Sequence, residues 1–562
     1  MMVHLIVIGM PVLIFILSLT WRFVSGPFWI GTNCDPSYQY LMNALYLADH
    51  RVPLYFQHPG TTLQLLGEGV IKLFNLFSGN VQMVEHVIKA PEFYLHAIYA
   101  LLMIFYAVSL ALLAWYAHRQ SRDVIFAFLV QAPAFLYLTM CKEKGFLLVP
   151  ANVTPEALMI GLINLYGICL LRAFFVEDKR SHWWTALGWG AVYGLLVATK
   201  FTSLSLVIIP LAVLPSFRSR LLFGAAAAAF FIMATMPVWT RYPLMWNNLY
   251  QMLTHTEFRG YGGPRGFIAW DSFRHGLMIT ICQQWLLMSS VLFILGVVCF
   301  RRFFRVSANR SYYWAAWVAL SVILQLLMVA KETAYHYMVP AMGLFGFLWA
   351  FMYRSGSGKP WLWRVAVLAF VISSLVFCLI GIGNAYKFSS AKQNFSKEVY
   401  SHKGAFICGY YRCSSLPFSL VYGDHCFGLD VYQEMIQGLY PRDLAMDILQ
   451  FKIIDPRGAF IEDALAGGQQ VLLYGAIHPE AFFSPLFQVK LLAQSGDEAL
   501  YEAIGANDRK AFEDFYLAQM ALMHGQGEAA YTLGLRSKAF GLPMARDFII
   551  QMDGMIAKVK AR

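Results

Sequence analysis

Apolar blocks of about 20 residues recur along most of this chain, and they constrain its fold more than any other feature. An α-helix of about 20 apolar residues crosses the roughly 30 Å hydrocarbon core of a bilayer. Charged residues make up only 13% of the chain, well below the roughly 25% of a soluble protein, and the mean hydropathy is +0.54. The sequence therefore predicts a polytopic α-helical membrane protein.

Eleven segments are predicted to cross the membrane, and the two around Lys200 are short and nearly continuous. The first has no Lys or Arg before it and no small-residue cleavage site after it, so we interpret it as a retained span rather than a signal peptide. The predicted spans are 3–21, 92–117, 124–140, 155–175, 184–199, 202–214, 221–239, 276–300, 313–330, 337–353 and 364–386.

Lys and Arg residues fall on alternate connections between these spans. Because such residues favour the cytoplasmic side, the pattern predicts a cytoplasmic N-terminus and places everything after about residue 387 on the far side. The net charge of +11 is thereby explained by topology, and no nucleic-acid partner is required. The residues that define the pattern are Arg119, Arg122, Lys179, Arg180, Arg218, Arg220, Arg301, Arg302, Arg305, Arg310, Arg354, Lys359 and Arg364.

Three regions are predicted from the composition. Residues 1–386 form the transmembrane domain, with a first far-side loop at about 22–91. Residues 387–505 read as an extramembrane α/β domain, and residues 506–562 read as amphipathic helices. Within the α/β domain we predict strands at Ala405–Cys408, Leu420–Tyr422, Gln470–Tyr474 and Ala499–Ala503, and a helix at Ile461–Ala466.

The first far-side loop carries the best candidate for chemistry, Asp35. Two segments of this loop, Tyr38–Leu47 and Thr62–Phe77, have apolar residues at helical spacing and read as surface helices. A carboxylate at the membrane interface can act as a general base, and the alternative is a cap for a helix that begins at Pro36. His58 follows in the run His58-Pro59-Gly60-Thr61-Thr62. It could position Asp35 or bind a phosphate, and the alternative is a structural histidine in a Pro-Gly turn.

Glu156 and Lys200 are the next candidates. Glu156 begins a predicted span, where a carboxylate serves either as a second acid or as a partner for the helix dipole. Lys200 lies between two apolar segments, and an ammonium placed deep in a bilayer costs roughly 2.5–3.5 kcal/mol. A phosphate headgroup would compensate this charge, and snorkelling of the long side chain is the alternative.

Two further far-side loops supply basic candidates for phosphate binding. One carries Lys331 with His336 and Tyr337, and the other carries Arg259 and Arg265 around a Gly-rich turn that could close over a substrate. Tryptophans near the second loop are better explained as an interfacial belt than as a sugar platform.

Several kinds of site are not supported by the sequence. No CxxC pair, HExxH helix, GxSxG elbow or Walker loop occurs, so zinc chemistry, nucleophilic hydrolysis and direct ATP use lack a motif. Cys408, Cys413 and Cys426 permit one disulfide if their compartment is oxidising. Involvement of a divalent metal stays open, although one Asp without a second acid makes a poor magnesium site.

The order of these features resembles the GT-C superfamily of polyprenyl-phosphate-sugar-dependent glycosyltransferases, in particular its bacterial protein-mannosyltransferase and aminoarabinose-transferase branch. The resemblance covers roughly residues 1–505. It rests on Asp35-Pro36-Ser37-Tyr38, His58-Pro59-Gly60, Thr154-Pro155-Glu156, Thr199-Lys200-Phe201-Thr202 and His336-Tyr337-Met338-Val339-Pro340. Many members carry an adjacent acidic pair in the first loop, whereas here Pro36 follows Asp35.

The resemblance implies an inverting membrane glycosyltransferase of the cell envelope. It would transfer a monosaccharide from a polyprenyl-phosphate donor to a glycan, lipid or protein acceptor on the periplasmic side of a bacterial inner membrane. Asp35 would be the base, with Glu156 and His58 beside it and the basic candidates on the donor phosphate. Two alternatives from other classes are a multi-span transporter and a non-catalytic scaffold for envelope assembly.

Overall fold

The computed structural model describes most of the chain between residues 5 and 552. The residues outside the description within that range are 31–33, 58, 78–81, 140–150, 177–178, 257–264, 304–309, 332–333, 357–359, 410–412, 425–430, 448–451, 455–464, 466, 477–486, 507–513, 515–517, 519–526 and 540–551. The described chain forms two compact units. One comprises Met1–Gly26, Tyr40–Arg259 and Gly266–Lys387, and the other comprises Pro27–Gln39, Gly260–Arg265 and Phe388–Arg562.

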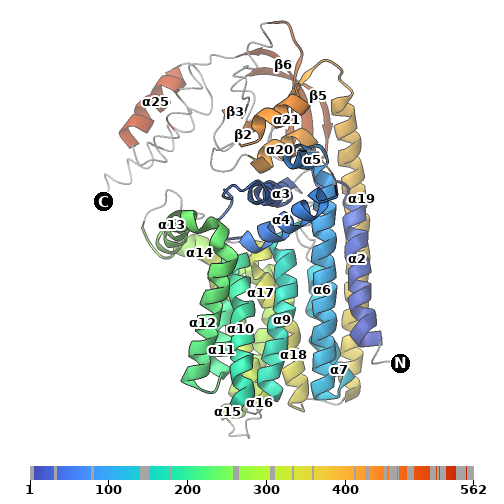
Figure 1. Cartoon of the computed structure of the whole chain (residues 1–562), viewed down its shortest axis with the longest axis vertical. Helices are drawn as coiled ribbons and strands as arrows, with labels where there is room; N and C mark the ends of the chain where they lie inside the picture. Colours follow the sequence, from blue (N-terminus) through green and yellow to red (C-terminus); the bar gives the residue numbers. More distant parts are fainter. Residues whose placement is uncertain are drawn as a thin grey trace. The chain divides into compact units, whose positions relative to one another are not determined.

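The first unit is a helical bundle of a polytopic membrane protein, as predicted (Figure 1). Among the described residues, six helical stretches are long and apolar enough to cross a membrane, and each overlaps a predicted span. They are Val7–Val24, Pro91–Ser121, Pro155–Phe175, Phe217–Thr254, Arg310–Lys331 and Trp361–Tyr400.

These stretches contain the following elements. The π-helical turn η1 (Leu5–Gly9) leads into α2 (Met10–Val24), and α12 (Phe217–Thr235) leads through the 3-10 turn η4 (Met236–Arg241) into α13 (Tyr242–Thr254). The other four are single helices: α6 (Pro91–Ser121), α9 (Pro155–Phe175), α16 (Arg310–Lys331) and α19 (Pro360–Tyr400).

The other five predicted spans are helical but shorter, interrupted or less apolar. Residues 276–300 were expected as one span, but α14 (Trp270–Gln283) and α15 (Trp285–Phe303) meet at 93°, so they count as at most one further span. The 21 residues of α10 (Lys179–Thr199) are rich in Trp and Gly, which lowers their hydropathy. The remaining elements are α7 (Val124–Leu129), α8 (Pro133–Thr139), η3 (Phe201–Val207), α11 (Ile208–Val213), η6 (Tyr335–Met338), α17 (Val339–Gly343) and α18 (Phe345–Arg354).

Small residues allow α10 and α12 to pack closely. An added Cβ at Gly190 or Gly194 would collide with a backbone carbonyl oxygen of α12, that of Phe223 or Ala227 respectively. Within a membrane, helix association depends on such close packing rather than on the hydrophobic effect. The four-residue spacing of the two glycines therefore fixes this helix pair.

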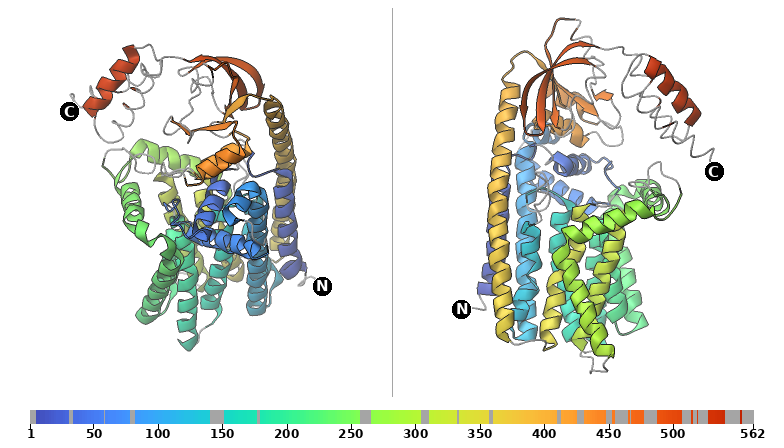
Figure 2. Two further views of the ribbon diagram at one scale, coloured as in Figure 1. Left: turned by 45° about the horizontal axis from the view of Figure 1, so that its top comes forward. Right: turned by 180° about the vertical axis from the view of Figure 1, so that it is seen from behind.

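Helices α2, α6 and α19 lie side by side (Figures 1 and 2). The indole of Trp21 is fully buried and donates a hydrogen bond to the Cys378 Sγ at 3.3 Å. Gly381 on α19 leaves the space that this ring occupies, because an added Cβ there would lie 2.6 Å from the Trp21 ring. Trp21, near the end of the first span, thus packs this span against α19.

Both segments of the first loop that were predicted to be helical form helices, α3 (Cys34–Ala48) and α4 (Thr61–Asn75), and residues 40–48 of α3 are buried. A short helix α5 (Met83–Lys89) follows. Asn43 of α3 accepts backbone hydrogen bonds from Leu54 (2.7 Å) and Tyr55 (2.8 Å), and Gln64 of α4 donates to the Tyr55 carbonyl at 2.6 Å. These buried amides fasten the segment between α3 and α4 to both helices.

The second unit contains a six-stranded mixed sheet of order β3-β2-β1-β4-β6-β5. Strand β1 is parallel to β2 and β4, and the outer pairs are antiparallel. The elements are β1 (Phe406–Gly409), α20 (Leu416–Asp424), α21 (Gln433–Leu439), β2 (Asp443–Asp447), β3 (Lys452–Ile454), β4 (Val471–Ala476), β5 (Phe487–Ser495) and β6 (Glu498–Ala506). The expected α/β character after residue 387 is therefore present.

Three of the four strands predicted here are found as β1, β4 and β6, but the strand at Leu420–Tyr422 was wrong. These residues lie in α20, because the Ser415 hydroxyl accepts from the Phe418 backbone N–H at 3.3 Å and Pro417 occupies the first turn. The predicted helix at Ile461–Ala466 lies almost wholly outside the described residues. In the C-terminal segment the structure describes the helix α25 (Gly527–Ala539).

A buried ion pair joins the end of α19 to the sheet. Lys392 donates to Glu498 at 2.9 Å, and Glu498 also accepts hydrogen bonds from Ser414 (2.6 Å) and Tyr474 (2.8 Å). Phe395 and Val399 of α19 pack with strand residues in the same core. Cys408 and Cys413 are buried, and Cys426 lies outside the described residues.

Candidate active site

The N-terminus of α9 positions Glu156. Thr154 is the N-cap, its hydroxyl accepting from the Ala157 backbone N–H at 3.3 Å, and Pro155 occupies the first helical position. Glu156 is therefore in the first turn and not the cap, and only 4% of it is exposed. Its negative charge complements the positive end of the helix dipole.

Lys200 lies at the break between α10 and η3, in an extended conformation. The side chain is buried, with 5% of the residue exposed, and its ammonium donates a hydrogen bond to Glu156 Oε1. Glu156 and Lys200 thus form a buried ion pair, in which Glu156 lies in the first turn of α9 and Lys200 directly follows the last residue of α10. Since an unpaired buried charge is costly, each of the two requires the other.

His336 and Tyr337 of η6 complete the cluster. The His336 Nε2 lies 3.8 Å from Glu156 Oε1, and the Lys200 ammonium lies 4.7 Å from the centroid of the Tyr337 ring. The two rings pack edge to face with centroids 4.5 Å apart. We call Glu156, Lys200, His336 and Tyr337 the ion-pair cluster.

Buried polar contacts hold the ion-pair cluster in place. Gln325 of α16 donates to the Tyr337 carbonyl at 2.7 Å and accepts from the Ser205 hydroxyl of η3. Arg22 of α2, only 3% exposed, donates to the Ala151 carbonyl and to Asn152 Oδ1 (3.4 Å), just before the cap of α9. Contacts from α2 thereby hold the chain just before α9, and contacts from α16 hold both η6 and η3.

The cluster suits recognition of an anion. Its two basic side chains face one carboxylate, and 25% of the His336 side chain is exposed, against 6% for Lys200. Because the Glu156 charge is already compensated by Lys200, this carboxylate fits the role of holding the ammonium better than that of a proton acceptor. A phosphate that reached His336 would lie beside the Lys200 ammonium, which Glu156 holds in position.

The segment that contains the His-Pro run packs next to Lys200. Thr62 of α4 and Thr199 share a hydrogen bond of 2.8 Å between their hydroxyls, and Thr199 immediately precedes Lys200. Gly60 has a φ of +64°, and an added Cβ there would lie 2.6 Å from the Tyr40 hydroxyl. Glycine is required at this turn for both reasons.

The remaining predicted site residues are placed as follows. Asp35 lies in the first turn of α3, which begins at Cys34. The alternative role of Asp35 as a helix cap required the helix to begin two residues later, at Pro36. The side chain of Asp35 is outside the description. His58 and Arg259 are also outside the described residues. The Lys331 ammonium lies 5.0 Å from the centroid of the Phe267 ring, and Arg265 is exposed.

Within the described part of the chain, no group of three or more His, Cys, Asp or Glu side chains is arranged to hold a metal ion. The ion-pair cluster has a single carboxylate, that of Glu156, and the ammonium of Lys200 already occupies the place that a cation would take beside it.

Sequence reasoning missed two residues that support the cluster, Arg22 and Gln325. Arg22 follows the first span on the side where Lys and Arg are disfavoured, and this exception to the charge pattern was an available signal. Gln325 lies in the middle of an apolar helix, where a buried amide requires partners.

The fold and this cluster define a polytopic membrane protein with a basic, aromatic site where several of its helices end. No family model matches the sequence, and no curated protein matches it. Among solved structures, the chain is similar to the crystal structure of ArnT from Cupriavidus metallidurans bound to undecaprenyl phosphate, with 13% identity and a TM-score of 0.47 over 88% of this chain and 98% of that chain. It is also similar to the apo state of that protein, with 14% identity and the same TM-score and coverage. At this level of identity and TM-score the likeness assigns no activity to this chain.

Proposed function

We propose that this protein is a membrane glycosyltransferase that moves a monosaccharide from a polyprenyl-phosphate donor to an acceptor hydroxyl. The observation that carries the proposal is the ion-pair cluster, a buried lysine and a partly exposed histidine joined through one carboxylate. A lysine and a histidine beside one carboxylate suit a lipid phosphate, and the first-loop Asp and the His-Pro run, by which the sequence resembles the GT-C superfamily, agree with it.

Each residue has a defined task in this reaction. The acceptor oxygen attacks the anomeric carbon and gives its proton to Asp35, the bond from that carbon to the phosphate oxygen breaks, and the configuration inverts. General base catalysis of this kind contributes about 10²–10⁴-fold. Lys200 and His336 stabilise the departing phosphate, and Glu156 is a positioning residue that orients both. Lys331, Tyr337, His58, Arg259 and Arg265 are further proposed contacts to the donor.

The position of the cluster favours an enzyme over a transporter. Glu156 is at the beginning of α9, Lys200 follows the end of α10, and His336 follows the end of α16, so the charges gather at helix ends. Sites of secondary transporters lie near the middle of the membrane, at breaks within spans. The donor would instead enter from one leaflet with its phosphate at the surface.

The Lys and Arg pattern supports a site in the periplasm. With the cytoplasmic loops assigned by that pattern, the far-side loops, the cluster and the α/β domain face the periplasm of a bacterial inner membrane. A polyprenyl-phosphate sugar is the activated donor that the resemblance to the GT-C superfamily implies, and the sequence has no Walker loop for direct use of ATP. Glycan, lipid and protein acceptors all fit this arrangement.

The test combines donor identification with a transfer assay. Lipids that co-purify with the protein are identified by mass spectrometry, and the lipid-linked sugar found is supplied to reconstituted protein with candidate acceptors. Asp35→Asn is compared with Asp49→Asn, whose carboxylate forms a partly exposed ion pair with Arg51 at 2.7 Å. We expect transfer to fall by at least about 100-fold in the first variant and to be unchanged in the second.

Three results would count against the proposal. Co-purification of lipids without any polyprenyl phosphate would remove the donor. Full activity of a folded Asp35→Asn protein would exclude this residue as the base. Uptake of a solute into proteoliposomes, without sugar transfer, would identify a transporter.

A further inference from the structure

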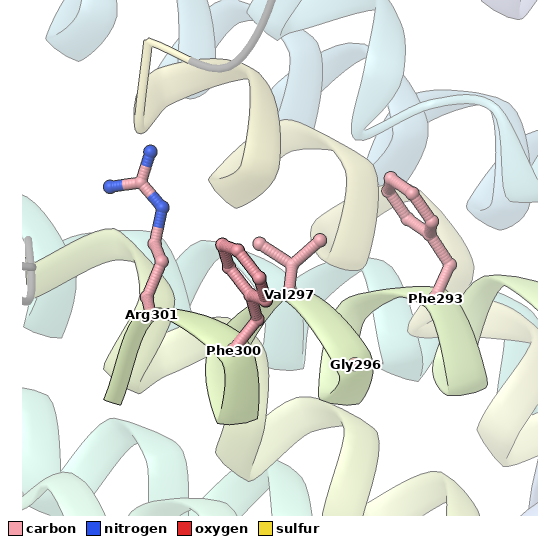
Figure 3. A pocket seen from close by; sticks show the side chains of 5 residues that line it. All are labelled: Phe293, Gly296, Val297, Phe300 and Arg301. Atoms are coloured by element: carbon pink, nitrogen blue, oxygen red, sulfur yellow. The ribbon is translucent and has the colours of Figure 1, made fainter. Parts of the chain in front are cut away.

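An open groove runs along α15 on the surface of the bundle. It has a volume of about 450 Å³ and is lined by Phe293, Gly296, Val297, Phe300 and Arg301, all on α15. Their side chains project from the same side of the helix, as the spacing of three and four residues requires (Figure 3). This volume lies within the roughly 300–1,000 Å³ of ordinary ligand sites.

The groove is apolar along its length. The Phe293 and Phe300 side chains are largely exposed, and Gly296 leaves open space, because an added Cβ there would meet no atom within 4 Å. The Phe293 ring stacks on Trp349 of α18 at 5.9 Å, and the Trp349 indole donates to the Ser290 hydroxyl at 3.1 Å. One wall is therefore fixed in position, while the face itself is open to what surrounds the helix, which on a membrane-spanning helix is lipid.

One end of the groove carries a positive charge. The Arg301 guanidinium lies over the Tyr312 ring of α16, 4.5 Å from its centroid, and Tyr312 is buried. The planar guanidinium of an arginine can bind a phosphate through two N–H donors. The sequence adds Arg302 and Arg305 on the same connection.

The groove is separate from the ion-pair cluster. Tyr312 is in the first turn of α16, whereas His336 follows the last residue of that helix, Lys331. The 22 residues of α16 rise about 33 Å, close to the thickness of the hydrocarbon core. Arg301 and the cluster therefore belong to opposite surfaces of the membrane.

We propose that this groove is a binding site for an anionic glycerophospholipid of the leaflet opposite the cluster. One acyl chain lies along Phe293, Gly296, Val297 and Phe300, and the phosphodiester binds Arg301. An anionic headgroup is preferred to a zwitterionic one because the latter brings its own cation to a basic surface. The proposal does not depend on the glycosyltransferase function.

The experiment titrates purified protein, in a non-ionic detergent, with dioleoylphosphatidylglycerol or dioleoylphosphatidylcholine and follows the first bound lipid by native mass spectrometry. Arg301→Gln removes the charge, and Arg354→Gln is its control, because Arg354 also lies over an aromatic ring (Phe175, 5.5 Å) but does not line the groove. Gly296→Leu fills the groove, and Gly224→Leu on α12, where an added Cβ also meets nothing within 4 Å, is the matched control.

We expect the native protein to bind the first phosphatidylglycerol about ten-fold more tightly than phosphatidylcholine, as one charge-assisted contact allows. Arg301→Gln should abolish this preference, and Gly296→Leu should weaken the binding of both lipids about ten-fold. The control variants Arg354→Gln and Gly224→Leu should bind both lipids as the native protein does. Equal native affinities for the two lipids overturn the proposal. So does loss of the preference in Arg354→Gln to the same degree, or native binding by a folded Gly296→Leu protein.

Discussion

Separating the two charges of the ion-pair cluster gives the sharpest test of how the site is built. Lys200 and Glu156 are 5% and 4% exposed, so neither charge is solvated once its partner is lost. Removing one member of a buried pair typically costs about 3–5 kcal/mol, against 0–1 kcal/mol for an exposed pair. We therefore expect Lys200→Met or Glu156→Met alone to lower the free energy of unfolding by about 3–5 kcal/mol.

The double variant distinguishes a paired charge from a general packing defect. With both charges replaced by apolar side chains of similar length, no buried ion is left unpaired, and stability should return to within about 1 kcal/mol of the native protein. The control is the pair Lys72–Glu68 on α4, at 2.6 Å, whose lysine side chain is 46% exposed. Lys72→Met should change stability by less than about 1 kcal/mol.

The assay has two readouts, equilibrium unfolding in mixed micelles and binding of undecaprenyl phosphate as the probe. If Lys200 contacts the donor phosphate, the stable double variant should still bind the probe about 10–100-fold more weakly, as expected for a lost charge-assisted hydrogen bond. A double variant as unstable as the worse single variant would refute the pairing argument. Native affinity of the double variant for the probe would refute the phosphate role of Lys200.

Three further predictions concern packing and pH. Gly194→Leu should lower the melting temperature because its side chain would collide with the α12 backbone, whereas Gly188→Leu on the same helix has open space; equal melting temperatures would contradict the close packing. Gly60→Ala should cost at least about 1–2 kcal/mol, since φ is +64° there; an unchanged free energy of unfolding would show that this turn relaxes. Burial raises the pKa of Asp443 from 3.8 to about 6, so the unfolded chain releases this proton at lower pH than the folded domain. Stability should fall as the pH rises from about 4 to about 6, by at most about 3 kcal/mol, and Asp443→Asn should flatten this dependence in unfolding measured against pH.

The sequence predicted the membrane-spanning helices well where one apolar block makes one helix. Pro91–Ser121 and Arg310–Lys331 are such blocks, and their length and hydropathy are local properties. The predicted span at 276–300 was interrupted because the chain turns by 93° near Gln284, where neither Pro nor Gly marks a break. A turn of this kind is stabilised by tertiary packing, which a hydropathy window does not register.

The candidate site was predicted in its parts and not in its pairing. Lys200 and Glu156 each stood out as a charge at the edge of an apolar segment, but they are separated by 44 residues and were assigned separate roles. Their contact depends on α9 and α10 running in opposite directions, so that the beginning of one meets the end of the other. The same geometry brings in His336, which no spacing in the sequence connects to Glu156.

The break after Thr199 links the fold to the site. The apolar run from α10 to the end of α11 would make a helix of about 50 Å if it continued from Lys179 to Val213, far longer than the roughly 30 Å of hydrocarbon. The chain instead becomes extended at Lys200, and the Thr199 hydroxyl bonds Thr62 at this point. An ammonium in the middle of a continuous helix would lie in hydrocarbon, whereas at the break it reaches the carboxylate at the N-terminus of α9. Lys200 thus both ends the span and carries the charge of the ion pair. Shifting the lysine by one position along the chain should therefore disrupt the break in the helix and the ion pair with Glu156.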